Sequence, residues 1–148
     1  MARESFIEIN YTDSKKPVYY VVDLLCRFGW SLYNPKGQIE YLPLGDNDDF
    51  NWKAEAMPKQ ELEQLMLEKQ KNEELIGINL FYEGTDFGIS LTGKNIDDIC
   101  ISLDINRYKI DESRDSLTNI CWYFEKIIKI LYSDKSMRFS YKIVDYIS

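Results

Sequence analysis

The sequence predicts an α+β fold over residues 1–148, as one domain with a mainly antiparallel sheet and helices packed largely on one face. The length fits one domain that can bury a sizeable core. Apolar residues alternate strictly three times between Ile76 and Ile105, which predicts three consecutive strands. A broad stripe at three- and four-residue spacing between Leu117 and Leu131 predicts a helix across the sheet. The expected element order is β-α-β-α-β-β-β-α-β.

The N-terminal part is expected to supply a strand and a helix. Residues 6–11 have the pattern of a strand. Ser14 is expected to cap a helix with Pro17 in its first turn, and Gly29 is a plausible C-terminal stop. The apolar residues of this helix form one stripe: Val18, Val21, Val22, Leu25 and Phe28.

A short strand, a loop and a second helix are expected next. The strand covers residues 38–42, after a turn at residues 34–37. The helix begins at Pro58 and extends to about Leu75, since this segment is rich in Glu, Gln, Lys and Leu. Its apolar stripe is narrow (Leu62, Leu65 and Met66), so most of the helix is expected to face water.

The rest of the chain predicts an antiparallel meander, a helix and a final strand. The meander covers residues 76–105, with a turn at residues 83–86. The acids among residues 111–115 precede the third helix, where they suit its N-terminal dipole. Residues 138–147 are expected to close the chain as a strand, with Phe139, Tyr141 and Ile143 on one face.

The charge of the chain is strongly and unevenly acidic. The formal net charge is −7, which argues against a nucleic-acid partner because such proteins need a basic face. Residues 46–74 contain nine acids and four lysines, so this segment carries −5 and the rest of the chain only −2. A partner with a basic surface is therefore expected.

The cysteines and the apolar runs predict a cytoplasmic protein. The N-terminal residues lack the apolar core of a signal peptide, and no apolar run approaches the length of a membrane span. The three cysteines, Cys26, Cys100 and Cys121, are far apart and lie within apolar patterns. They are expected to be reduced, buried thiols.

No catalytic, metal-binding or cofactor-binding residues are predicted. The chain has no histidine, which removes Ser-His-Asp and Cys-His catalysis and histidine-bearing zinc sites. Residues 88–95 have the glycine and lysine spacing of a phosphate-binding loop, but Asn95 stands where Ser or Thr must reach magnesium. Asp46 and Asp48 match the start of a calcium loop, but Phe50 stands at the third ligand position.

The stretch Gly45–Trp52 places three acids beside two large aromatic residues in a predicted loop. Acids can steer a basic partner toward this loop, and exposed aromatic side chains can anchor it. A plain solvated face is the alternative. The candidate partner-binding residues are Asp46, Asp48, Asp49, Phe50, Trp52 and Glu55.

In overall character and in the stretch Asp46–Trp52, the chain resembles bacterial immunity proteins of polymorphic or contact-dependent toxin systems. Proteins of that class are small, cytosolic, often acidic and without catalytic motifs, and many cover the basic active site of a nuclease toxin. The resemblance implies a non-enzymatic protein that neutralises a cognate toxin by occluding a basic surface. It assigns no residue-by-residue roles, because the class spans many unrelated folds.

Two other functions fit the sequence. A small hydrolase or lyase could use paired carboxylates, with Glu83, Asp86, Asp97, Asp98 and Asp104 as candidates. A small-ligand or adaptor domain could use the polar face of the meander around Asn79, Ser90 and Ser102. A deep pocket between two acids would favour the enzyme, and an enclosed cavity against the polar face would favour the ligand-binding domain.

Overall fold

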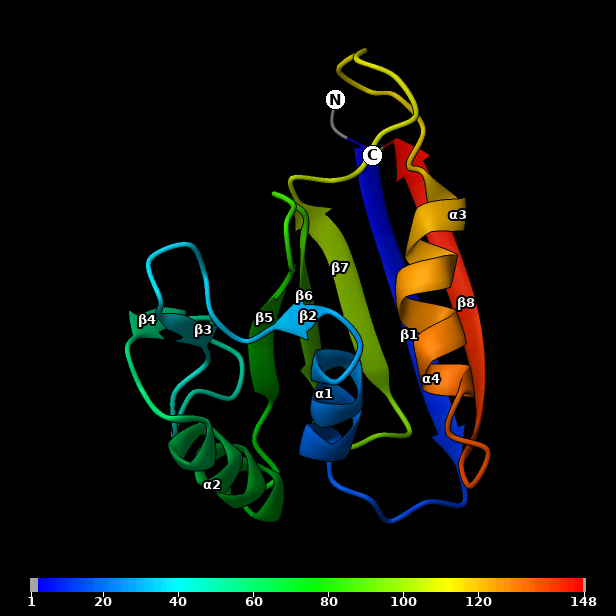
Figure 1. The fold of residues 1–148 in the computed structure, drawn as a ribbon. Helices are drawn as coiled ribbons and strands as arrows, with labels where there is room; N and C mark the ends of the chain where they lie inside the picture. Colours follow the sequence, from blue (N-terminus) through cyan, green and yellow to red (C-terminus); the bar gives the residue numbers. More distant parts are fainter. Residues whose placement is uncertain (1–2, 148) are drawn as a thin grey trace.

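The computed structural model, which describes residues 3–147, contains one eight-stranded sheet with antiparallel ladders (Figure 1). Seven strands follow the order β4-β3-β5-β6-β7-β1-β8, and β2 pairs with β5 beside this path. The strands are β1 (Arg3–Thr12), β2 (Trp30–Ser31), β3 (Ile39–Tyr41), β4 (Lys53–Glu55), β5 (Ile76–Tyr82), β6 (Gly88–Gly93), β7 (Ile99–Ile105) and β8 (Arg138–Ile147).

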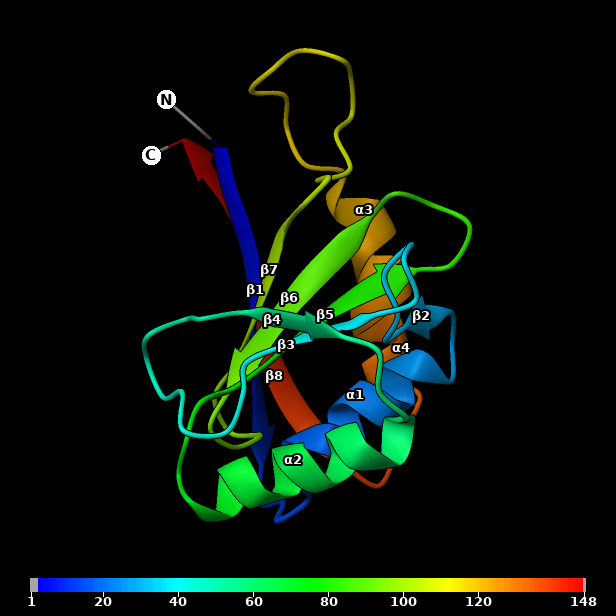
Figure 2. The same ribbon diagram turned by 90° about the vertical axis from the view of Figure 1, so that its left-hand side faces the viewer.

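The helices lie together on one side of this sheet (Figure 2). They are α1 (Val18–Cys26), α2 (Lys59–Lys71) and a third helix made of α3 (Ile120–Tyr123), a π-helical segment η1 (Phe124–Ile128) and α4 (Lys129–Tyr132). The predicted α+β class, with an antiparallel sheet and helices largely on one face, is confirmed.

The core lies between the sheet and these helices. Alternation places one side of each strand against the helices, so the buried residues follow a period of two along β1, β5, β6 and β7. Their fully buried members are Ile7, Ile9, Ile76, Ile78, Leu80, Ile89, Leu91, Ile99, Ile101 and Leu103. The opposite face of the sheet carries no helix (Figure 2), and we call it the open face.

The predicted meander and the final strand are confirmed. β5, β6 and β7 pair in sequence order, with one register irregularity between Gly88 and Ser90. β8 pairs with β1 at ten consecutive positions, from Thr12 opposite Arg138 to Arg3 opposite Ile147. The long-range pairing of the two ends of the chain thus completes the sheet.

The predicted start of the first helix is wrong. Pro17 occupies the position before α1, and the hydroxyl of Ser14 accepts a hydrogen bond from Lys16 instead of capping the helix. The first N–H of the helix, at Val18, donates to the side-chain oxygen of Gln70 in α2 at 2.9 Å. A distant residue therefore does the capping, which local patterns could not reveal.

The third helix also differs from the predicted single stripe. It begins at Ile120, so Leu117 lies before it and is 54% exposed. The π-helical turns at residues 124–128 rotate the side chains that follow, because each such turn holds an extra residue. Cys121 is exposed, so the expectation of a buried thiol is wrong there. The other two cysteines are partly buried, and burial raises the pKa of Cys26 to about 11.

Two short strands were not predicted. β2 pairs with β5, and β4 pairs with β3 just beyond the acidic loop. Two- and three-residue strands are too short to show a period in the sequence. β4 matters for the site, because it places Glu55 on an edge strand and not in the loop.

Candidate functional site

The acidic loop connects β3 to β4 and is bound by reciprocal hydrogen bonds to residues 74 and 75, just beyond the C-terminal end of α2. The Gly45 N–H donates to the carboxylate of Glu74 at 2.7 Å. The Leu75 N–H donates to the side-chain oxygen of Asn47 at 2.9 Å. These bonds join the loop and the acidic helix α2 into one surface, as their shared charge in the sequence had suggested.

Asp46 organises the loop from inside it. Its side chain is only 5% exposed, and its carboxylate accepts hydrogen bonds from the N–H groups of Asp49, Phe50 and Asn51 at 3.0, 3.2 and 2.7 Å. Burial disfavours the charge, but these N–H donors and Lys69 outweigh it and hold the pKa of Asp46 below its ordinary value. The prediction that Asp46 contacts a partner is therefore corrected: it shapes the surface that others form.

Lys69 fastens the loop to α2. Its side chain is fully buried, and its ammonium group donates to the backbone carbonyl oxygens of Pro43 at 2.6 Å and Asp46 at 2.7 Å. The carboxylate of Glu74 lies 3.7 Å away. Burial lowers the pKa of Lys69, and the carboxylates of Glu74 and Asp46 oppose that effect. A buried cation from α2 thus lies beneath the loop, which the acidic net charge of this segment did not indicate.

Phe50 stands out on the surface of the loop. Its backbone has φ 54°, in the left-handed region that Gly and Asn occupy most easily, and its ring is 53% exposed. A residue of this size at positive φ is held there at a cost of about 1 kcal/mol. The hydrogen bond from its N–H to Asp46 is part of what holds it. Burial of the ring does not compensate for this strain, because the ring is largely exposed.

Trp52 bends from the loop over the open face of the sheet. A Cβ atom built at Gly77 would lie 2.6 Å from Leu42 Cδ1 and 3.0 Å from Trp52 Cη2. Gly77 in β5 therefore makes room for both side chains, and Leu42 is nearly fully buried. Trp52 keeps 37% of its surface exposed. Its ring thus lies close to β5 and is still accessible.

The remaining candidates are exposed acids. Asp48 and Asp49 lie on the outside of the loop. Glu55, on β4, accepts a hydrogen bond from the Tyr41 hydroxyl at 2.8 Å. Burial and this carboxylate raise the pKa of Tyr41 to about 12. We call the set Asp48, Asp49, Phe50, Trp52 and Glu55 the acidic-aromatic surface.

The carboxylates proposed for an enzyme are not all brought together. Glu83 and Asp86 line an open hollow of about 340 Å³ beside Tyr33 and Asn34. Asp97 and Asp98 lie beyond the other end of β6, in the turn that leads to β7. Asp104 accepts a hydrogen bond from Ser102 at 2.8 Å on the open face. One pair of candidates shares a shallow hollow, and the others are spread over the sheet.

The polar residues of the open face form a chain of hydrogen bonds. Asn34 and Asn79 donate to the two carboxylate oxygens of Glu40 at 2.8 and 2.9 Å. Ser90 donates to the side-chain oxygen of Asn79 at 2.6 Å. These side chains satisfy one another's hydrogen-bonding groups across β3, β5 and β6. The bonds within the sheet therefore account for the polar residues that the sequence places on this face. Ser102 belongs to a separate pair with Asp104.

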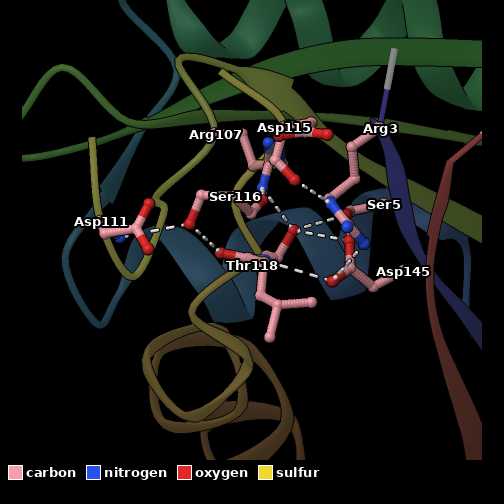
Figure 3. Close-up of polar contacts among 9 residues, drawn as sticks. Arg3, Ser5, Arg107, Asp111, Asp115, Ser116, Thr118 and Asp145 are labelled. Atoms are coloured by element: carbon pink, nitrogen blue, oxygen red, sulfur yellow. Dashed lines mark hydrogen bonds and ion pairs between the residues drawn. The ribbon is translucent and has the colours of Figure 1, made fainter. Parts of the chain in front are cut away.

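A buried polar cluster at the far end of the sheet was missed from the sequence (Figure 3). Ser5 in β1 bonds to Thr118 and to Asp145 in β8, each at 2.5 Å. The guanidinium group of Arg3 lies 3.4 Å from the carboxylate of Asp145. Arg107 donates to the Thr118 hydroxyl at 2.9 Å. Ser5 is 1% exposed, so its hydroxyl is not accessible from the surface. The cluster ties the long segment 106–119 to the two terminal strands.

The arrangement of metal-binding residue types and the character of the helices also bear on the site. Among residues 3–147, no three His, Cys, Asp or Glu side chains gather as a metal site requires. None of the helices in that range has the length and apolar character needed to cross a membrane.

The fold and the site together define a class: an α+β domain that carries a preorganised acidic-aromatic surface at one edge of its sheet. No protein-family model matches the chain, and the comparisons with curated proteins and with solved structures give no similar protein.

Proposed function

We propose that this protein is a non-enzymatic binding protein that docks a basic protein on its acidic-aromatic surface. The observation that carries the proposal is Phe50, an exposed phenylalanine held at positive φ on an acidic loop. Backbone strain at an exposed bulky residue is commonly kept for function, since folding alone does not reward it.

The fixed shape of the loop supports binding. Ordering a flexible loop on association weakens affinity, whereas a loop that is already ordered avoids much of that loss. Asp46 and Lys69 supply this order from beneath the surface. Aromatic side chains such as those of Phe50 and Trp52 are the residue types that dominate binding energy, and the acids around them steer a basic partner.

Within that class, we propose an immunity-type inhibitor that neutralises a cognate bacterial toxin in the cytoplasm by covering a basic surface or active site. The support is the net charge of −7, the concentration of acids at residues 46–74 and the resemblance described above. A carboxylate-based hydrolase or lyase would instead have to work in the shallow hollow at Glu83 and Asp86.

The test is co-expression of this chain with candidate toxin domains taken from the genes that neighbour its own, with cell growth and complex formation as readouts. The wild-type chain is expected to restore growth and to co-purify with the domain. Phe50→Ala combined with Trp52→Ala is expected to weaken binding at least about 30-fold, as for two anchor residues. Phe28→Ala is the control, because Phe28 is 49% exposed elsewhere on the molecule.

Two outcomes would contradict these proposals separately. If the chain binds the domain and the Phe50 and Trp52 changes have no effect, the acidic-aromatic surface is not the interface. If the chain binds but growth is not restored, it is a binding protein without immunity function.

A further inference from the structure

The sheet ends in two edges of very different character. β4, at one edge, has three residues, of which Lys53 and Glu55 are charged. β8, at the other edge, has ten residues and pairs with β1 at every position without a bulge (Figure 1). Natural proteins usually protect long edges with prolines, bulges, shortness or charged side chains. Of these devices β8 has only three charged residues, Arg138, Lys142 and Asp145.

The direction of the free backbone groups in β8 follows from one hydrogen bond in β1. The Tyr11 N–H donates to the Ile96 carbonyl at 3.0 Å, on the β7 side of β1. Because backbone groups alternate in direction along a strand, the even-numbered residues of β1 must bond to β8. Asn10 is opposite Ser140 and Glu8 is opposite Lys142. The even-numbered residues of β8 therefore point their N–H and C=O groups toward β1.

The odd-numbered residues of β8 therefore point their N–H and C=O groups outward: Phe139, Tyr141, Ile143, Asp145 and Ile147. Within residues 3–147, no backbone hydrogen bond is made to these outward groups. Tyr141 and Ile147 are also 46% and 42% exposed. The edge is a regular row of donors and acceptors beside exposed apolar side chains.

We propose that β8 is a dimerisation edge whose occupant is β8 of a second copy of this chain, antiparallel about a twofold axis at Ile143. In this register residues 139–147 pair completely with the same residues of the second copy. The five outward residues then form about ten hydrogen bonds across the interface, two per bonded pair.

The charges of the side chains disfavour two alternative registers. Centred on Ile143, the pairing places Lys142 opposite Val144 of the second copy and Tyr141 opposite Asp145, and no like charges meet. Centred on Lys142 it would oppose two lysines, and centred on Asp145 two carboxylates, which are destabilising pairs. Self-complementarity of this kind is what a twofold contact requires.

The distribution of charge also permits this contact. β8 carries Arg138, Lys142 and Asp145, a local charge of +1, although the whole chain carries −7. The acidic segment lies at the opposite edge of the sheet, where β4 and α2 are (Figure 1). Dimerisation through β8 keeps the two acidic segments far apart, and it leaves the acidic-aromatic surface free. Dimerisation through β8 and docking on the acidic-aromatic surface are independent of each other.

Sedimentation equilibrium of the full chain tests the dimer. The expected mass is twice the 17.5 kDa of one chain. Tyr141→Pro removes an outward N–H and no bond to β1, so it is expected to yield a folded monomer with unchanged circular dichroism. Tyr141→Thr, which keeps the N–H, is expected to remain a dimer. A wild-type monomer, or a Tyr141→Pro protein that stays folded and dimeric, would overturn the proposal.

A disulfide tests the register. Lys142 and Val144 of the two copies would form non-hydrogen-bonded pairs, with Cα atoms about 4.5 Å apart, inside the range of disulfides. Lys142→Cys with Val144→Cys, in a Cys121→Ser background that removes the exposed native thiol, is expected to give a covalent dimer on oxidation. Ser140→Cys with Val144→Cys should not crosslink, and the reverse result would refute the register.

Discussion

The Lys69 ammonium nitrogen lies 2.7 Å from the backbone carbonyl oxygen of Asp46, and the side chains of both residues are buried. The carboxylate of Asp46 in turn accepts three N–H groups of its own loop. The shape of the acidic-aromatic surface therefore depends on a cation from α2 that a partner would never touch.

Replacing Lys69 with Met should destabilise the protein by about 3 kcal/mol, because it leaves buried carbonyl oxygens and the carboxylate of Glu74 without their cation. Urea unfolding measures this change. Lys71→Met is the matched control: Lys71 lies two residues on in the same helix and is exposed, so its loss should change stability by less than about 0.5 kcal/mol. Equal effects at the two positions would contradict the role given to Lys69.

Replacing Phe50 with Asn should separate stability from binding. Asn adopts positive φ more easily than Phe, so the variant is expected to be as stable as the wild type or more stable by up to about 1 kcal/mol. Binding of the basic partner should weaken at least about tenfold, because an anchor is lost. Thermal unfolding and isothermal titration calorimetry give the two numbers. A less stable variant that binds normally would show that Phe50 serves folding.

Removing the exposed acids of the loop should slow association. Asp48→Asn with Asp49→Asn is expected to lower the association rate about tenfold at low salt and to weaken its dependence on salt. The control removes the same charge elsewhere: Glu112→Gln with Asp115→Asn, in the segment at the opposite end of the sheet (Figure 1). Stopped-flow mixing with the partner compares the two. Equal slowing would mean that only net charge matters.

Gly77→Ala should disturb Trp52. The new methyl group would lie 2.6 Å from Leu42 Cδ1 and 3.0 Å from Trp52 Cη2, so one of these side chains must move. A loss of about 1–3 kcal/mol is expected from this overpacking, with a red shift of tryptophan fluorescence as Trp52 becomes more exposed. In a Trp52→Phe background the spectral change should disappear. If it persists, it comes from Trp30 or Trp122.

Stability should fall in acid because of Asp145 as well as Asp46. Burial disfavours the charge of Asp145, but hydrogen bonds from Ser5 and Thr118 and the nearby Arg3 keep its pKa below the ordinary value. A depressed folded pKa gives stability that is fully present above the unfolded value of about 3.9 and is lost as the pH falls through the folded value. Urea midpoints should therefore drop below about pH 4.

Asp145→Asn is the diagnostic variant for this acid dependence. It is expected to be less stable than the wild type at neutral pH and to lose less stability on acidification, because one of the depressed carboxylates is gone. Asp115→Asn, at an exposed acid of the neighbouring segment 106–119, should keep the wild-type slope. An unchanged slope in Asp145→Asn would assign the acid sensitivity to the other carboxylates.

Local patterns found most of the regular structure. Residues 76–105 alternate strictly, and each strand of the meander formed where the alternation placed it. The third helix shows the limit of that reasoning. Its apolar residues predicted a uniform stripe, but a π-helical segment interrupts the α-helical repeat. The buried residues are Tyr123, Ile127, Ile128 and Leu131, and Cys121 is exposed.

Local sequence patterns were enough to predict the α+β class, the meander, the final strand and the concentration of acids near residues 46–74, because each is a property of neighbouring residues. Tertiary structure alone decided that Asp46 is an internal scaffold and that Lys69 is buried beneath it. The same holds for Ser5 and Asp145, which meet only because β1 and β8 pair across the length of the chain. Burial and hydrogen bonding between distant residues depend on how the chain closes on itself, and no local period records that.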